Sequence, residues 1–417
     1  MKDYWHSVAL EKEKCNGCTI CLRRCPTEAI RIRDGKARII KERCIDCGEC
    51  IRVCPYHAKK AFADDLKSIE KYKFKIALVS LPLYGQFALD MDINKIFNCF
   101  YELGFDMVYD VAYAADLATS LQSDIIKSSK TKPLIATLCP AIIRLIQIRF
   151  PSLIDNIINL ESPMEIAARL AKQQASKEYG LNSNDIGAFY ITQCPAKITS
   201  IKKPLGIQKS YVDGAIPIKS IYTKLLKIYK DVKRNDKIQK ASGDGIGWAR
   251  VSGQSFALGL DRFLAVDGIE NVIKVLEEIE LGKLNNIDFF EGYACVTGCV
   301  GGPLNVENPF VAKNRIRQLA NNYQKSELNS EKTTKILDGI DVGWTEEIEP
   351  IGIMKLDSDI GKAIEKMELI DMIIKELPGI DCGSCGAPNC HAMAEDVVRG
   401  KARLEDCIIR MKRKADK

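Results

Sequence analysis

The chain has 417 residues, of which 46% are hydrophobic, and carries a formal net charge of +6. This length allows about two to four domains with sizeable cores. Acidic and basic residues are interleaved without a long basic block, which argues against a nucleic-acid-binding protein. Neither a membrane-spanning apolar run nor a signal-peptide core is present, so we expect a cytoplasmic protein without a membrane span.

Cysteine usage points to metal clusters. The chain contains 17 cysteines but only 3 histidines. Disulfide scaffolds are usually short and exported, whereas so many thiols in a reducing compartment are typical of metal ligands. Repeated CxxCxxC triplets favour iron–sulfur clusters over zinc, and the shortage of histidine argues against haem, non-haem iron and copper.

The first 65 residues or so contain an internal repeat, CNGCTICLRRCP and CIDCGECIRVCP. In each CxxCxxCxxxCP motif three thiolates converge on one cubane, and the fourth cysteine serves the other cluster. We therefore predict one 4Fe–4S cluster on Cys15, Cys18, Cys21 and Cys54, and a second on Cys44, Cys47, Cys50 and Cys25. A zinc-bound or metal-free remnant is the alternative.

The segment from about residue 70 to residue 325 has the pattern of an α/β fold. The apolar runs KIALVSL, PLIATLC and IGAFYIT indicate buried strands. Helical periodicity follows in INKIFNCFYELG, PAIIRLIQIRF, SPMEIAARLAKQ and GIENVIKVLEEIE. Residues 322–360 are polar and predict a linker, after which IGKAIEKMELIDMIIKELPG predicts one more helix.

A last cysteine cluster follows that helix, at Cys382, Cys385, Cys390 and Cys407. Glycines at 383 and 386 permit the tight backbone that wraps a cluster, and a helix over HAMAEDVVRGKARLEDC would bring the fourth thiol back to it. This segment resembles the small 4Fe–4S domain of Rnf-type electron-transport complexes and of some sensory iron–sulfur proteins. Zinc is the alternative metal, and we interpret His391 as a surface or helix-cap residue.

Five cysteines remain. Cys99 lies in the apolar helix pattern NKIFNCFYEL and is interpreted as a core thiol. The other four follow predicted strands or lie in glycine-rich loops, so a shared site would have to be built by the folded domain. They would complete a fourth cubane: Cys139, Cys194, Cys295 and Cys299.

The sequence around these four cysteines resembles the FeFe hydrogenase catalytic domain. TLCPA (137–141), TQCPAK (192–197) and EGYACVTGCVGG (291–302) are similar to its three signature motifs, in the same order. LPLYG (81–85), ESPMEI (161–166) and RVSGQS (250–255) match further segments of the family.

The resemblance implies a domain organisation with two twisted sheets flanked by helices in the catalytic domain. We predict a two-cluster ferredoxin-like α+β module at 1–68, an H-cluster catalytic domain at 69–325, a linker at 326–362, and a small helical 4Fe–4S domain at 363–417.

The resemblance also implies an H-cluster, which is a cubane joined through one cysteine to a diiron unit that carries CO, cyanide and a bridging azadithiolate. The scattered cysteines would bind its cubane, with Cys299 as the bridge. Lys197 would donate to one cyanide, and the backbone of Leu81 and Pro82 would face the other. Ser162, within ESPMEI, is placed among the cofactor-binding residues, and Glu291 matches the glutamate of the third motif, as a catalytic residue beside Lys197 and Cys299.

The sequence departs from active family members along their proton path. Leu138 replaces the proton-relaying cysteine before the first ligand, and Ile158 replaces a relay serine. The acidic stretch near Gln122 has lost its carboxylates, and Thr192 and Tyr293 replace two methionines of the diiron pocket. Loss of a positioned relay slows a reaction by on the order of 10² to 10⁴. Replacement relays could involve Glu161, Glu165, Glu291 or Tyr293.

We therefore expect an FeFe hydrogenase that interconverts H₂ with protons and electrons slowly and acts as an H₂ or redox sensor. Its partners would be a ferredoxin or a signalling protein, together with hydrogenase maturation proteins. Three alternatives are a metabolic hydrogenase with another proton path, an iron–sulfur scaffold or electron-transfer protein without the diiron unit, and a multi-cluster electron wire within a larger complex.

Overall fold

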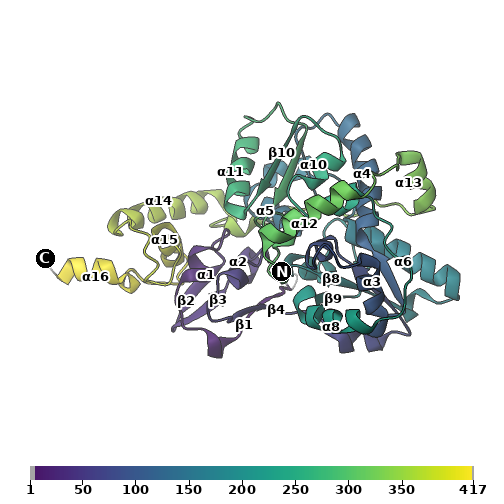
Figure 1. Ribbon diagram of the computed structural model, residues 1–417. Coiled ribbons are helices and arrows are strands. Elements are labelled where there is room, and N and C mark those ends of the chain that lie inside the picture. The colour runs from purple at the N-terminus through teal and green to yellow at the C-terminus, as the bar shows by residue number, and fades with distance from the viewer. Residues whose placement is uncertain (1–4, 416–417) are drawn as a thin grey trace. The chain divides into compact units, whose positions relative to one another are not determined.

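A computed structural model describes residues 5–415 and divides the chain into two compact units. The first unit joins the two ends of the chain, up to Ala61 and from Pro350 onward, which are purple and yellow in Figure 1. The second unit is Phe62–Glu349. Among the described residues, every helix is too short or too polar to cross a membrane.

The second unit is built on two parallel sheets. The larger sheet has the strand order β6-β5-β8-β9, and the smaller has the order β10-β11-β7. Their strands are β5 (Phe74–Val79), β6 (Met107–Asp110), β7 (Leu134–Ile135), β8 (Ile186–Thr192), β9 (Gly214–Pro217), β10 (Phe263–Asp267) and β11 (Phe289–Tyr293). All seven residues of β8 are buried, as expected for a central parallel strand covered on both faces.

Helices connect and cover these sheets (Figure 1). They are α3 (Ile93–Glu102), α4 (Val111–Ser128), α5 (Pro140–Arg149), α6 (Pro163–Tyr179), α7 (Pro195–Lys202), α8 (Ile218–Asp231), α9 (Gly243–Gly247), α10 (Gly253–Ala257), α11 (Ile269–Glu280), α12 (Pro309–Asn322) and α13 (Ser330–Leu337). The three predicted strands and four predicted helices of this region are confirmed. Helix α6 ends at Gly180, whose φ of 64° suits a glycine C-cap.

The first unit begins with a small α+β module. Its strands and helices are β1 (Val8–Leu10), α1 (Ile20–Arg23), β2 (Ile30–Arg33), β3 (Lys36–Ile39), α2 (Glu49–Arg52) and β4 (Lys59–Ala61). Strands β1 and β4 pair antiparallel, and β2 and β3 form a hairpin. Each copy of the sequence repeat therefore forms one short helix followed by one strand, α1 with β2 and α2 with β4.

The C-terminal part of the same unit contains α14 (Ile360–Glu376), α15 (Cys390–Val398) and α16 (Ile408–Ala415). It docks on β2 and the residues around it. The Ile32 amide donates to the Gly386 carbonyl at 2.9 Å, and the buried Arg31 side chain donates to both carboxylate oxygens of Asp396, at 2.6 and 3.1 Å. Arg43 and Glu395 form a second buried ion pair.

Two sequence expectations differ from the observed structure. The predicted linker contains α13, which packs on α4 with the Ser120 and Thr333 hydroxyls 2.6 Å apart. The prediction of one continuous helix from residue 391 to 407 is wrong, because α15 ends at Val398. Gly400 then adopts a φ of 68°, a left-handed conformation that interrupts a right-handed helix, so Cys407 reaches the cluster region from a separate turn.

Candidate active site

The four scattered cysteines of the second unit all follow parallel strands. Cys139 comes after β7, Cys194 after β8, and Cys295 and Cys299 after β11. The carboxyl ends of parallel strands lie at one edge of each sheet, where open α/β folds form their sites. Strand β8 belongs to the larger sheet, whereas β7 and β11 belong to the smaller one, so the candidate site draws on both. The fold thus gathers residues that lie far apart along the chain, as the sequence analysis expects for a shared site.

Two of these cysteines occupy equivalent positions at helix starts. Cys139 is the N-cap of α5 and Cys194 is the N-cap of α7, and in each case proline occupies the first helical position. Proline fits there because the amide it lacks would have no partner within the helix. Since the N-terminus of a helix carries partial positive charge, both helices favour an anionic group beside these thiols.

The loop from Cys295 to Cys299 is held in an unusual backbone conformation. Thr297 has a φ of 73° and Gly298 a φ of 91°. A β-carbon at Gly298 would lie 2.6 Å from the Val251 amide nitrogen, so only glycine fits. The Thr297 amide donates to the Asp267 carboxylate at 2.6 Å, which ties the loop to the end of β10. The loop is therefore fixed by its surroundings before any ligand is considered.

Electrostatic interactions show that these thiols lie close together. Burial, and next the charge of Cys295, raise the pKa of Cys194 to about 12. Burial, and next the charges of Cys139 and Cys194, raise the pKa of Cys299 well above its usual value, while Lys197 opposes the rise. Lys197 is only 2% exposed. The site therefore combines four thiols with one buried ammonium group.

This donor set fits an iron–sulfur centre. Crowded, desolvated thiols resist ionisation on their own, whereas bound metal ions stabilise the thiolates directly. Thiolates are ligands for iron–sulfur clusters and zinc, and Lys197 adds a cation suited to an anionic group beside them. The residues present therefore fit the cubane and the charged diiron unit of an H-cluster. Their roles as ligands stay predictions.

The remaining predicted cofactor residues lie after β5, at a small cavity and on β11. Leu81 and Pro82 are buried in the short helix Leu81–Gly85 that follows β5. Ser162 is the N-cap of α6 and lines a cavity. Glu291 is fully buried on β11 and accepts hydrogen bonds from the Gln254 and Ser255 amides, at 3.4 and 2.9 Å. These bonds give Glu291 a structural role in anchoring α10, whatever else it does.

Apolar or neutral side chains occupy the positions at which the resemblance places proton-relay residues. Leu138 is 5% exposed and Ile158 is 1% exposed, so neither presents a titratable group to the site. Gln122 is buried, and its side-chain oxygen accepts from the Gln254 amide group at 2.5 Å. Tyr293 is also buried, and burial, followed by the charges of Glu291 and Cys299, raises its pKa well above the usual value.

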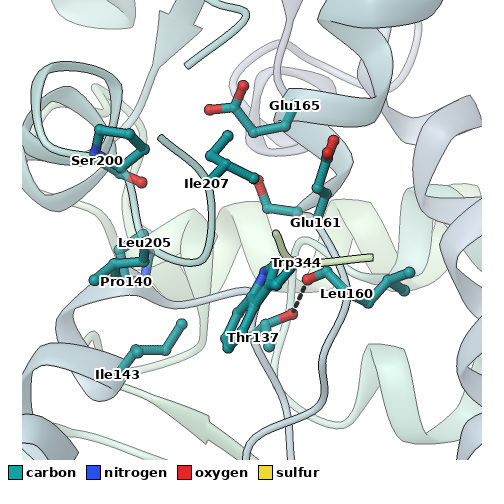
Figure 2. Close-up of a pocket in the computed structure, with 12 residues that line it drawn as sticks. Thr137, Pro140, Ile143, Leu160, Glu161, Glu165, Ser200, Leu205, Ile207 and Trp344 are labelled. Atoms are coloured by element: carbon teal, nitrogen blue, oxygen red, sulfur yellow. Dashed lines mark hydrogen bonds between the residues drawn. The ribbon is translucent and has the colours of Figure 1, made fainter. Parts of the chain in front are cut away.

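A cavity of about 30 Å³ is lined in part by Thr137 and Pro140, which flank Cys139 in the sequence. Figure 2 shows the Glu161 and Glu165 side chains at this cavity, with Thr137 donating to the Leu160 carbonyl. The Ser210 hydroxyl and the Tyr211 amide donate to Glu165, at 2.7 and 2.9 Å. A volume of this size holds about one water molecule.

Glu161 predicts a pH dependence of stability. Burial, partly opposed by the charge of Arg169, raises its pKa from 4.5 to about 7. Between these values the folded protein binds a proton that the unfolded chain does not, so folding stability falls as the pH rises through this range. In the parent protein this decrease in the free energy of unfolding should be on the order of 2–3 kcal/mol. The Glu161→Gln variant resembles the protonated form and should not show the decrease.

The measurement is the difference in Tm between the Glu161→Gln variant and the parent protein at pH 5 and at pH 7.5. The Tm of the variant should rise relative to the Tm of the parent protein as the pH rises. Glu178→Gln, at an exposed position on α6, is the control and should show no such trend. Parallel pH profiles for Glu161→Gln and the parent would contradict the assignment.

In the ferredoxin-like module, thiols of the two motifs interact electrostatically, and their assignment to two clusters stays a prediction. Burial raises the pKa of Cys21 to about 11, and the neighbouring charges that act on it include those of Cys15, Cys18 and Cys54. Burial also raises the pKa of Cys44, and the charges of Cys50 and Cys25 raise it further. His6, Asp46 and Cys44 also lie together, with the His6 ring 2.8 Å from Asp46.

Three of the four C-terminal thiols interact electrostatically. Burial raises the pKa of Cys385, and the charges of Cys407 and Cys382 act on it in the same direction. Cys390 begins α15, and its amide donates to Asp381 at 2.6 Å. His391 is exposed on the first turn of α15. Cys99 is fully buried in α3, where its thiol donates to the Lys95 carbonyl at 3.2 Å.

Several residues that shape these sites carry no motif signal in the sequence. Asp267 holds the Cys295–Cys299 loop, and Arg31 and Asp396 join the two cluster-bearing parts of the first unit. No local motif marks them, since each acts on a partner distant in sequence. Lys59 could have been found from the sequence. When the two copies of the repeat are aligned, Lys59 occupies the position at which the other copy has Ile30.

Comparisons with known proteins agree with this division. Residues 76–253 and 225–303, together more than half of the chain, match the family described as iron only hydrogenase large subunit, C-terminal domain. Residues 7–55 match the 4Fe-4S dicluster domain, and residues 377–409 match the FeS family, named for an Fe-S cluster.

Two curated relatives are similar over part of their length. Iron hydrogenase 1 of Clostridium pasteurianum is 26% identical over 147 residues, which cover 34% of this chain and 25% of that protein. The periplasmic Fe hydrogenase large subunit of Nitratidesulfovibrio vulgaris is 26% identical over 215 residues, covering 47% of this chain and 51% of that protein. The chain thus spans about a quarter and about half of these relatives.

A solved structure of FeFe-hydrogenase HydA1 from Chlamydomonas reinhardtii has the same fold. It aligns with a TM-score of 0.51 at 14% identity and covers 68% of this chain and 95% of that chain. The predicted α/β fold of the catalytic domain, with its ferredoxin-like module and C-terminal Fe–S domain, is confirmed.

Proposed function

Since the chain belongs to the family of iron-only hydrogenase large subunits, we propose that it is an FeFe hydrogenase that turns H₂ over slowly and acts as an H₂ or redox sensor. The observation that carries the proposal is the convergence of Cys139, Cys194, Cys295 and Cys299 with the buried Lys197 at the ends of parallel strands.

Each residue of this site has a definite part. The four thiolates would hold the cubane, with Cys299 also holding the diiron unit, and Lys197 would place a cation beside the cyanides. The loop that contains Gly298 keeps Cys299 in place and the apolar surroundings exclude water. The H-cluster, when bound, supplies the chemistry that splits or forms H₂.

Slow turnover is inferred from the groups that surround the site. Leu138 lies directly before Cys139, and Ile158 is buried beside the same sheet, so neither can pass a proton on. A relay that is missing slows proton exchange by on the order of 10² to 10⁴ without affecting how the cluster is held. Such a protein can still respond to H₂, because detection requires binding and a change of redox state rather than flux.

Electrons would enter or leave through the cubanes of the first unit. Its two cluster-bearing parts are docked together through buried ion pairs, so they form one redox-active body rather than two independent ones. We propose a ferredoxin or a signalling protein as the redox partner, and hydrogenase maturation proteins as the source of the diiron unit.

Infrared spectroscopy tests the proposal. The protein is purified without oxygen and loaded with the diiron cofactor, and the spectrum is recorded under argon and under H₂. Bands of CO and cyanide that shift under H₂ are expected, together with a turnover rate at least about 10²-fold below that of a hydrogenase with an intact relay.

Two results would contradict the proposal. Intact cubanes without CO and cyanide bands would favour an iron–sulfur scaffold or electron-transfer protein that lacks the diiron unit. Shifting bands together with fast turnover would retain the hydrogenase and contradict slow sensing, since the chain would then have an efficient replacement proton path.

A further inference from the structure

The two copies of the ferredoxin repeat differ at one buried position. Ile30 follows Cys25 by five residues, and Lys59 follows Cys54 by five residues. The two positions share one local hydrogen bond. The amide one residue earlier donates to the cysteine sulfur in both copies, at 3.2 Å for Ala29 and at 3.3 Å for Ala58. A charged side chain thus replaces an apolar one in the same local structure.

Lys59 is as buried as its counterpart. Ile30 is 2% exposed and Lys59 is 3% exposed. Lys59 begins β4, where it pairs with Leu10 of β1, and its Nζ has no hydrogen-bond partner among the described residues. Lys60, the next residue, points to solvent and forms an ion pair with Glu11. Burying an ammonium group without a hydrogen-bond partner is costly, so the absence of such a partner for Lys59 Nζ in residues 5–415 requires an explanation.

The thiols around Lys59 belong to both predicted clusters. The charge of Lys59 acts on Cys21, where it opposes the rise in pKa to about 11 that burial causes, and on Cys50, where it opposes the rise to about 12. Burial also tends to raise the pKa of Cys54, but amide hydrogen bonds, including one from Lys59, hold that pKa below its usual value. Cys21 and Cys54 belong to the first predicted set, and Cys50 to the second.

We propose that Lys59 sets the reduction potentials of both ferredoxin clusters, with its ammonium group, which lies near thiols of both predicted sets, serving as a shared counter-ion. The clusters would supply sulfur acceptors and negative charge to this side chain. The inference rests on the dicluster module and not on hydrogenase activity, so a failure to find the diiron unit would leave it standing.

The direction of the effect follows from charge. Each cubane becomes more negative by one charge when it accepts an electron. A fixed cation therefore stabilises the reduced form more than the oxidised form, and this raises the potential. Because Lys59 is buried, salt screens its charge far less than it screens the charge of an exposed lysine. Its position near both sets of thiols predicts that both clusters are affected.

The experiment is a redox titration of the full-length protein followed by electron paramagnetic resonance. Lys59→Ile copies the residue of the other repeat, and Lys59→Met retains most of the length of the side chain. Lys60→Ile is the matched control, since it removes a neighbouring but exposed lysine. The signals of the two ferredoxin clusters are identified by their loss in the Cys18→Ser and Cys47→Ser variants.

Both Lys59 variants should keep their iron and show both ferredoxin clusters shifted to lower potential. A tenfold change in the reduction equilibrium, about 59 mV for one electron, is the expected scale. Lys60→Ile should leave both potentials in place. Unchanged potentials in the Lys59 variants, or an equal shift in Lys60→Ile, would overturn the proposal. Loss of the clusters from both Lys59 variants would also overturn it, since Lys59 would then be needed for assembly.

Discussion

Replacing Lys197 with alanine should abolish the infrared bands of CO and cyanide while the cubanes remain. Lys197 is 2% exposed and its charge acts on Cys194 and Cys299. An anionic diiron unit brought into this buried site requires a cation, and removing one partner of a buried charge pair costs about 3–5 kcal/mol. That energy corresponds to a loss of at least about 10²-fold in retention of the unit. The measurement is infrared intensity per protein after loading, alongside iron content.

The thiols themselves are not changed in this variant, so the cubane that they hold should be unaffected. Lys202→Ala is the control, since Lys202 is exposed at the other end of the same helix, α7. It should load the diiron unit as the parent protein does. Full band intensity in Lys197→Ala would show that the buried ammonium group is not needed, and the proposed role of Lys197 would have to be withdrawn.

The parts of the fold that the sequence predicted have a strong periodic or apolar signal. Strand β8 is a continuous run of seven buried residues, and α3 and α11 begin and end close to the expected positions. Strand β10 was missed although its sequence, FLAVD, begins with four apolar residues, and in the structure all five residues are partly exposed. The continuous C-terminal helix was predicted wrongly because Gly400, a single residue, interrupts it.

The candidate site was predictable to the extent that its residues lie in motifs. The cysteines and Lys197 have characteristic neighbours, such as the prolines after Cys139 and Cys194. What the sequence could not give is the docking of the C-terminal module. The segment IRIR gives no sign that Arg31 pairs with a carboxylate 365 residues later, because the local sequence around each residue contains no information about its distant partner.

That docking depends on Asp396, and the Asp396→Ala variant should destabilise the first unit strongly. Asp396 is 3% exposed and accepts hydrogen bonds from Arg31, and from Arg33 at 2.9 Å. The alanine variant leaves the Arg31 guanidinium buried without its carboxylate, which costs about 3–5 kcal/mol. The measurement is the denaturant concentration at which the absorbance of the cubanes is lost, in the full-length protein.

The matched control is Asp34→Ala. Asp34 also pairs with an arginine, Arg38, on the same hairpin, but both side chains are largely exposed, at 82% and 65%. Such pairs contribute about 0–1 kcal/mol, so this variant should lose its cubanes at nearly the parental denaturant concentration. Replacing both partners, Arg31→Met with Asp396→Leu, should recover much of the loss, since no buried charge from this pair would then remain. Equal effects of Asp396→Ala and Asp34→Ala would mean that the buried ion pair does not hold the C-terminal module in place, and the two cluster-bearing parts would then have to be treated as separate redox bodies.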